Sequence, residues 1–130
     1  MTLSAADRTE ILDVIGRAAA AATRRDAGAY AGLFTDDAVL DGSQGRHPAA
    51  ALRSSVGPIW APEGPATLHL TLNPVVDPGD GPDDAVVSSI LLIVEPAAAI
   101  TIRTAVAITQ TLRRTGDTWR ISRRTVAEYR

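Results

Sequence analysis

The sequence contains no cysteine and no lysine, and these absences exclude several kinds of chemistry. Without cysteine the chain forms no disulfide, no thiolate nucleophile and no zinc–sulfur site. Without lysine it forms no Schiff base with a carbonyl substrate. Histidine is scarce too: His47 and His69 lie 22 positions apart, unlike the close pairs with which one helix binds zinc. We therefore expect no bound metal ion and no cofactor.

The sequence also lacks a large excess of charge of either sign and any long apolar run. The formal net charge is −2 at pH 7, so the composition does not favour nucleic acid, and we interpret the C-terminal arginines as a solvated face. No apolar run approaches the ~20 residues that a membrane helix needs. The N-terminal residues carry charges where a signal peptide needs an apolar segment. We expect a cytoplasmic protein, and arginine in place of lysine is typical of GC-rich bacterial genomes.

The first half of the chain has the pattern of helices. With 130 residues, 45% of them hydrophobic, residues 1–130 are expected to form a single globular domain. Ser4 is a predicted N-cap, and apolar residues then recur at helical spacing through residue 22. Asp26 is expected to cap a short second helix. Pro48 is expected to begin a third, which Gly57 and Pro58 end.

The second half has the pattern of strands. Segments 67–77, 85–94, 99–114 and 119–129 are apolar or alternating and are separated by turn formers, and a short strand is expected within 35–42. Helices followed by sequential strands predict an α+β fold. We expect a cone-shaped α+β barrel, in which three N-terminal helices pack on a curved, mostly antiparallel sheet. The open mouth of such a cone is where a ligand pocket forms.

Three segments carry a resemblance to a known family: RRDAGAYAGLFTDDAVLDG, TLHLTLNPVVD and TGDTWRISRRTV. With this order of elements, the chain resembles the SnoaL-like branch of the nuclear transport factor 2-like (cystatin-like) superfamily over essentially its whole length. The resemblance implies a pocket for a small, apolar, carbonyl-bearing molecule and a homodimer formed through the sheet. The family includes polyketide cyclases, dehydratases and isomerases, as well as binding modules without catalytic activity.

The chain departs from the family at the acidic positions. Related dehydratases carry an aspartate late in the first helix, where this chain has Thr23, or Asp26 if the alignment shifts by three residues. Many cyclases and isomerases place an acidic residue on the penultimate strand, where this chain has Gln110. The isomerase base aligns near Asp41. The acid–base pair of the family is therefore incomplete in this alignment.

His69 is the leading catalytic candidate, because an imidazole accepts and returns a proton near neutral pH. Alternation places Asn73 on the same face of its strand, where it would orient a ligand. The alternative is a structural histidine facing solvent. Asp41 is the second catalytic candidate, although aspartates in this segment are more often turn and capping residues. Asp26 and Asp41 are the expected sources of a carboxylate for His69.

Four more residues are predicted to bind substrate, each with a structural alternative. Gln110 either holds a ligand oxygen or lies where its strand leaves the core. Tyr30 either points its hydroxyl into the cavity or packs in the core. Trp60 either covers the mouth as a lid or anchors a loop. Arg124 matches a family pocket position and would meet a carboxylate or carbonyl.

Three functions remain open from the sequence. The first is a cofactor-free cyclase, dehydratase or isomerase that uses His69 for proton transfer. The second is a non-catalytic ligand-binding module or accessory subunit of the same fold. A small subunit of a ring-hydroxylating dioxygenase is a third option, for which the chain is short. A carboxylate within hydrogen-bonding distance of His69 would favour the enzyme.

Overall fold

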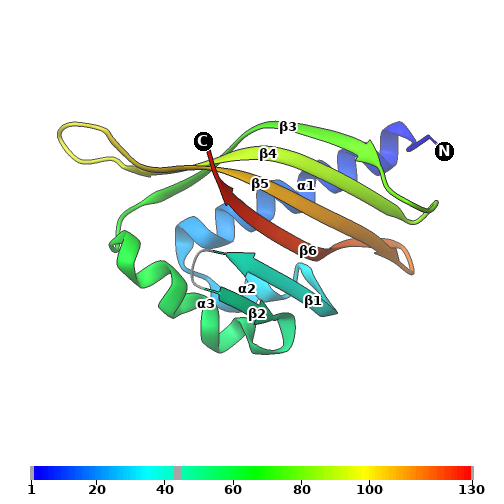
Figure 1. The fold of residues 1–130 in the computed structure, drawn as a ribbon, viewed down its shortest axis with the longest axis horizontal. Coiled ribbons are helices and arrows are strands. Elements are labelled where there is room, and N and C mark those ends of the chain that lie inside the picture. The colour runs from blue at the N-terminus through cyan, green and yellow to red at the C-terminus, as the bar shows by residue number, and fades with distance from the viewer. Residues whose placement is uncertain (1, 43–44, 130) are drawn as a thin grey trace.

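The computed structural model describes residues 2–42 and 45–129. These residues form three α-helices, two short 3-10 helices and six strands, the last four of which follow one another without an intervening helix (Figure 1). The helices are α1 (Ala5–Arg24), α2 (Ala27–Ala31), η1 (Ala49–Ala51), α3 (Leu52–Trp60) and η2 (Ala61–Glu63). The strands are β1 (Phe34–Gly42), β2 (Gly45–Pro48), β3 (Leu68–Pro78), β4 (Asp84–Glu95), β5 (Thr101–Thr115) and β6 (Thr118–Glu128).

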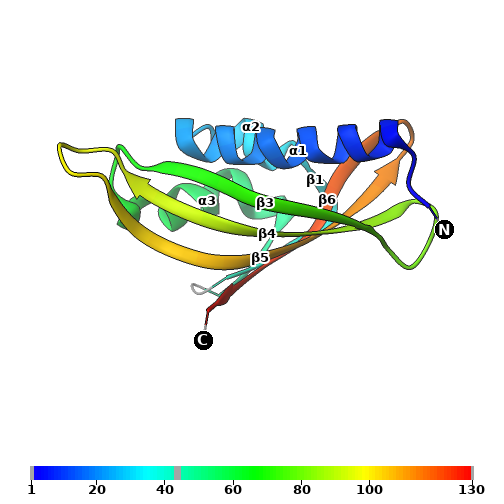
Figure 2. The same cartoon turned by 90° about the horizontal axis from the view of Figure 1, so that it is seen from above.

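The strands form one curved sheet in the order β2-β1-β6-β5-β4-β3. All neighbours are antiparallel except β1 and β6, which run parallel. Helix α1 lies along the concave face of the sheet, and α3 lies toward the end at which the β4–β5 hairpin projects (Figure 2). The α+β class and the three helices on a mostly antiparallel sheet are confirmed. Strand β2 was not predicted.

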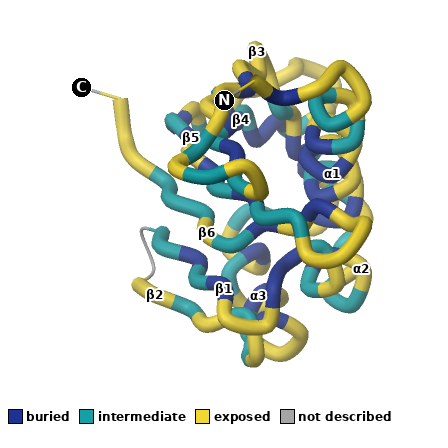
Figure 3. The backbone as a smooth tube through the Cα atoms, turned by 90° about the vertical axis from the view of Figure 1, so that its right-hand side faces the viewer, coloured by how far each residue is buried: buried dark blue, intermediate teal, exposed yellow. Residues whose placement is uncertain are grey.

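Helix α1 changes in side-chain size along its buried face. Ser4 and Asp7 form a capping box at its start, which satisfies free backbone N–H groups. The buried residues of the first half are large, namely Ile11, Val14 and Ile15, and those of the second half are alanines. Figure 3 shows the buried side of α1 facing the sheet. The helix therefore fills the space beneath its first half and leaves space beneath its second.

Trp119 is the centre of the filled half and is only 1% exposed. Its Nε1–H donates to Asp7 Oδ1 at 3.3 Å, and the Arg114 guanidinium lies over its ring at 4.9 Å from the centroid. Arg114 Nη1 also donates to Asp7 Oδ1 at 2.8 Å. The capping hydrogen bond from Ser4, followed by the contacts with Trp119 and Arg114, holds the pKa of Asp7 below its usual range. This cluster fastens the start of α1 to the β5–β6 hairpin.

Helix α3 corrects one prediction, since it continues through Gly57 and Pro58 instead of ending there. A proline in a helix interior removes a hydrogen bond and costs about 3 kcal/mol. Leu52, Val56 and Trp60 recur at four-residue spacing and are all buried. Their packing outweighs the local cost of Pro58 and carries the helix on to Trp60.

Strands β3 and β5 each contain an irregularity that changes which side chains face inward. In β3 the register shifts between Leu72 and Val75, because Pro74 has no N–H for the ladder and Asn73 adopts a left-handed φ of 52°. In β5, Val106, Ile108 and Leu112 are buried, whereas Ile100 and Ile102, which continue the same alternate spacing toward the N-terminus, are exposed. Ile100 and Ile102 are 78% and 59% exposed. Ile102 pairs with Val94 of β4, directly after the register shift between Ile93 and Val94.

The outer face of the sheet carries exposed apolar side chains, among them Leu70 and Leu72 at 38% each and Val75 at 55%. Strand β4 lies between β5 and β3, and its buried residues alternate along most of its length. Pairing of two copies through this face remains a prediction, which light scattering at micromolar concentration would test. Within the described residues, no helix combines the length and the apolarity required to cross a membrane.

Candidate functional site

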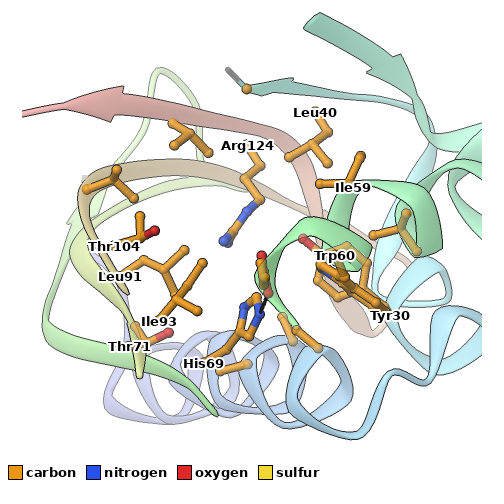
Figure 4. A pocket seen from close by; sticks show the side chains of 18 of the residues that line it. Tyr30, Leu40, Ile59, Trp60, His69, Thr71, Leu91, Ile93, Thr104 and Arg124 are labelled. Carbon is orange, nitrogen blue, oxygen red and sulfur yellow. Dashed lines mark hydrogen bonds and ion pairs between the residues drawn. The ribbon is translucent and has the colours of Figure 1, made fainter. Parts of the chain in front are cut away.

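A cavity of about 740 Å³ lies between the alanine-rich half of α1, helix α3 and the concave face of the sheet. Its walls are mostly apolar, and a few polar side chains point into it (Figure 4). Ala18, Ala19 and Ala22 form the α1 wall, where larger side chains would occupy the space. Cavities of this size and composition are typical of small-molecule sites.

His69 and Glu63 form the most tightly held polar contact in this cavity. His69 Nε2–H donates to Glu63 Oε1 at 2.6 Å, and the two side chains are only 5% and 16% exposed. The His69 backbone N–H donates to Thr23 Oγ1 at 2.9 Å, which joins the end of α1 to β3. Strand β3 thus fixes the imidazole while η2 brings the carboxylate to it.

The contact with Glu63 determines which nitrogen of His69 is available for chemistry. An ionised carboxylate only accepts hydrogen bonds, so Nε2 must carry a proton. In the neutral ring Nδ1 then holds the lone pair. Among the described residues, none hydrogen-bonds to Nδ1. Nδ1 is therefore the atom that can accept a proton from a ligand.

Arg25 holds the segment that carries Glu63. It ends α1 in a left-handed conformation with φ 59°, and its Nη1 donates to Ala22 O at 2.7 Å. Its Nη2 donates to Gly64 O at 2.8 Å and to Thr67 Oγ1, and lies 3.8 Å from Glu63 Oε1. Gly64, with φ 91°, turns the chain directly after Glu63. One guanidinium thereby links the helix end to both sides of this turn.

Aromatic rings form the wall beside His69. The Trp60 ring lies 6.3 Å from the His69 ring and 5.2 Å from the Tyr30 ring, both nearly edge to face. Burial raises the pKa of the Tyr30 hydroxyl; Glu63 adds to this effect and Arg124 opposes it. Trp60 is 4% exposed, so it belongs to the wall and is not a lid, which corrects one predicted alternative.

Arg124 and His47 bring polar groups from the sheet to the opposite wall. Arg124 points into the cavity from β6 (Figure 4). His47 lines the cavity from β2, and its enclosed Nε2 has no hydrogen-bond partner among the described residues. Arg103, at the rim, pairs with Glu95 at 2.8 Å. Arg124 forms no ion pair with any residue that the structure describes.

The structure does not bring the remaining candidates into the cavity. Asp41 lies outside its lining and pairs with Arg123 and with Arg46 Nε at 2.8 Å, and the hydrogen bond from Arg46 lowers the pKa of Asp41. Asp26 caps α2 through Ala29 N–H, as predicted. Neither aspartate is the carboxylate beside His69, so that expectation is wrong.

Asn73 and Gln110 also lie outside the cavity lining. The β3 irregularity leaves Asn73 exposed and outside the cavity lining, so it does not share the cavity with His69. Gln110 is 1% exposed, which rules out the alternative that its strand has left the core there. No described residue hydrogen-bonds to its buried Oε1.

Sequence reasoning missed Glu63 and His47. Glu63 lies in APEGPA, a segment of turn-forming residues with no periodicity, and only the six-residue separation from His69 hints at a chain reversal that joins them. His47 lies in the strand that was not predicted. Among the described residues, no group of three histidine, aspartate or glutamate side chains could hold a metal ion.

Comparison with known proteins finds one family model that covers nearly the whole chain. A family model described as a SnoaL-like domain matches residues 4–125. No curated protein matches the chain. A solved protein of unknown function with a cystatin-like fold, from Nostoc punctiforme, superposes with a TM-score of 0.86 at 21% identity, covering 97% of this chain and 93% of that chain.

Two further solved structures have the same fold. An NTF2-like protein with a cystatin-like fold from Novosphingobium aromaticivorans has a TM-score of 0.78 at 22% identity, over 94% of this chain and 81% of that chain. ActVI-ORFA from Streptomyces coelicolor has a TM-score of 0.80 at 18% identity, over 92% of this chain and 95% of that chain. Likeness at this level of identity establishes the shared fold.

Proposed function

The chain belongs to the SnoaL-like domain family, and we propose that it binds a small, apolar, carbonyl-bearing molecule and transfers a proton on it without a cofactor. One observation carries the proposal: the 2.6 Å contact between His69 Nε2 and Glu63 Oε1, enclosed in the wall of a cavity of about 740 Å³. The carboxylate that the alignment did not supply is thereby present in the site, on a different element.

The pair has the chemistry of a general base with an orienting carboxylate. His69 Nδ1 removes a proton from a carbon beside the substrate carbonyl, and the electron pair of the broken C–H bond moves onto the carbonyl oxygen as an enolate. Glu63 holds the ring in the required tautomer and stabilises the imidazolium that forms. The imidazolium then returns the proton to another carbon in an isomerisation, or to a departing hydroxyl in a dehydration.

The other cavity residues position the substrate in this proposal. Tyr30 and Trp60 supply an aromatic wall for an apolar ring system. Arg124 faces the bound molecule from the opposite wall. Asp41, Asn73 and Gln110 have no direct part in the reaction.

Hydrogen–deuterium exchange tests the shared first step without knowledge of the natural substrate. The probe is 1-indanone in D₂O, and the loss of its α-proton signal is followed by ¹H NMR. His69→Ala is expected to lower the protein-catalysed rate about 100-fold or more, within the range typical of general acid–base catalysis. Glu63→Gln lowers it to a smaller extent, because the base remains but loses its orienting partner.

Glu10→Gln is the matched control, since it makes the same carboxylate-to-amide change on α1, outside the cavity lining. It should leave the exchange rate unchanged. Exchange by the wild type that persists in both His69→Ala and Glu63→Gln would contradict the proposal. If the wild type binds cyclic ketones but exchanges none of them, the proposal is wrong and the chain is a binding module.

A further inference from the structure

One row of residues crosses the concave face of the sheet and carries three polar side chains. The strand register pairs His47 with Leu40, Leu40 with Arg124, and Arg124 with Gln110. Residues directly opposite one another on neighbouring strands share a face. Leu40 and Gln110 are buried on the helix-facing side, so this polar row (His47, Leu40, Arg124 and Gln110) lies on the cavity side of the sheet.

Each polar member of the row has a group without a hydrogen-bond or ion-pair partner among the described residues. His47 Nε2 and Gln110 Oε1 are enclosed, and no residue that the structure describes hydrogen-bonds to either atom. Arg124 is half-buried, points into the cavity and has no carboxylate partner in the described chain. Buried polar groups are nearly always hydrogen-bonded, and a partly buried cation without a counter-ion is costly. Their gathering in one row points to a group that the ligand supplies.

We propose that the polar row is an anion subsite and that the ligand is an apolar molecule bearing one carboxylate. A carboxylate offers two acceptor oxygens that match the planar fork of Arg124. His47 lines the cavity on the neighbouring side of the row, and rotation of its ring would bring the enclosed Nε2–H to the same group. Gln110 Oε1, adjacent to Arg124, accepts a guanidinium N–H that the ligand leaves free.

The charges around the cavity favour a monoanion over a phosphate. Of the described cations that line the cavity, Arg124 has no carboxylate partner, whereas Arg103 is paired with Glu95. Glu63 and Glu128 also line the cavity, and their negative charges would oppose a dianion. With its carboxylate at the polar row, the apolar body of the ligand lies toward the aromatic wall and His69 (Figure 4).

Calorimetric titration with 2-naphthoate and its neutral amide, 2-naphthamide, tests the subsite. The inference rests on the proposed function, because both place the ligand in this cavity, but binding of these probes involves no proton transfer. The wild type is expected to bind the carboxylate at least about tenfold more tightly than the amide, as charge-assisted hydrogen bonds imply. Inorganic phosphate, the competing anion, is expected not to displace the naphthoate.

Arg124→Gln should remove most of the preference for the carboxylate, and Arg124→Lys should keep part of it. Arg120→Gln is the matched control, because it removes the same charge from an exposed position on the same strand. His47→Leu should weaken naphthoate binding several-fold, and His47→Gln, whose amide N–H replaces Nε2–H, should restore it. Circular dichroism of each variant shows that the fold is kept.

Equal wild-type affinity for the two probes, or no binding of the naphthoate, would overturn the proposal. So would a carboxylate preference that survives in Arg124→Gln and Arg124→Met, or displacement of the naphthoate by phosphate. These results would leave the proton-transfer function standing, since that depends on exchange by His69 and Glu63. Conversely, a carboxylate preference without any exchange of 1-indanone supports the subsite and removes the catalytic function.

Discussion

The two ends of the space between α1 and the sheet are built from the same layers but serve different purposes. At one end Ile11, Leu112, Trp119 and Ile121 fill the space, and none of them is more than 1% exposed. At the other end α1 presents alanines, and the sheet presents His69 and other polar side chains to a cavity. The comparison shows that side-chain size along one helix determines where the space between α1 and the sheet is filled and where it can hold a ligand.

The largest expected effect is at the filled end. Trp119→Ala removes a fully buried ring together with its contacts to Asp7 and Arg114, and it should lower the free energy of unfolding by about 3–5 kcal/mol. Urea denaturation followed by circular dichroism measures this. A loss below about 1 kcal/mol would mean that the filled end can collapse around the missing ring, and the contrast between the two ends would weaken.

At the hollow end, loss of the Arg25 guanidinium should have an intermediate effect. Arg25→Gln removes the charge-assisted hydrogen bonds to Gly64 O and Thr67 Oγ1 and should cost about 1–3 kcal/mol of stability. Freed from this link, Glu63 leaves His69, so the protected His69 ring N–H disappears from ¹H–¹⁵N spectra and 1-indanone exchange slows. The exposed neighbour provides the control, because Arg24→Gln should change neither.

Filling the cavity should separate binding from stability. Ala18→Leu adds three carbon atoms to the α1 wall and should weaken 2-naphthoate binding by more than tenfold. Because the added atoms enter existing space, the free energy of unfolding should change by less than about 1.5 kcal/mol. Ala20→Leu, on the exposed side of the same helix, should leave binding intact. Unchanged binding in Ala18→Leu would place the ligand elsewhere.

The smallest expected effect is a pH dependence at the filled end. The pKa of Asp7 is lowered in the folded state, chiefly by the capping hydrogen bond from Ser4. Such a group stabilises the fold above its unfolded-state pKa, and this contribution is lost as the pH falls through the folded-state pKa. Asp7→Asn should therefore destabilise the protein at pH 7 and much less near pH 3. An equal difference at both values would show that charge is not the cause.

The order and type of most elements followed from the sequence because their signals are local. The Ser4 cap, the helical spacing from Ile11 to Ala22 and the alternation in the strands are properties of neighbouring residues. Predictions went wrong where packing overrides a local rule. Pro58 remains within α3 because Val56 and Trp60 are buried on either side of it. The short strand β2 is too brief to show a period of its own.

The candidate site was only partly predictable for the same reason. His69, Tyr30, Trp60 and Arg124 lie on regular elements and do line the cavity. Asn73 lies at the irregularity beside Pro74, where alternation of faces fails. Glu63 reaches His69 through a turn whose path depends on Gly64 and Arg25, and a contact of that kind leaves no periodic signal.

The origin of Glu63 bears on how such a protein changes over time. Its carboxylate comes from η2, a three-residue segment outside the core, whereas His69 belongs to the sheet. Substitutions or small insertions between Trp60 and Leu68 can move or replace the acid without disturbing a packed layer, since surface connections accept such changes readily. In evolution and in enzyme redesign alike, changes in this segment can therefore alter the reactivity of the site while the helices and the sheet keep their structure.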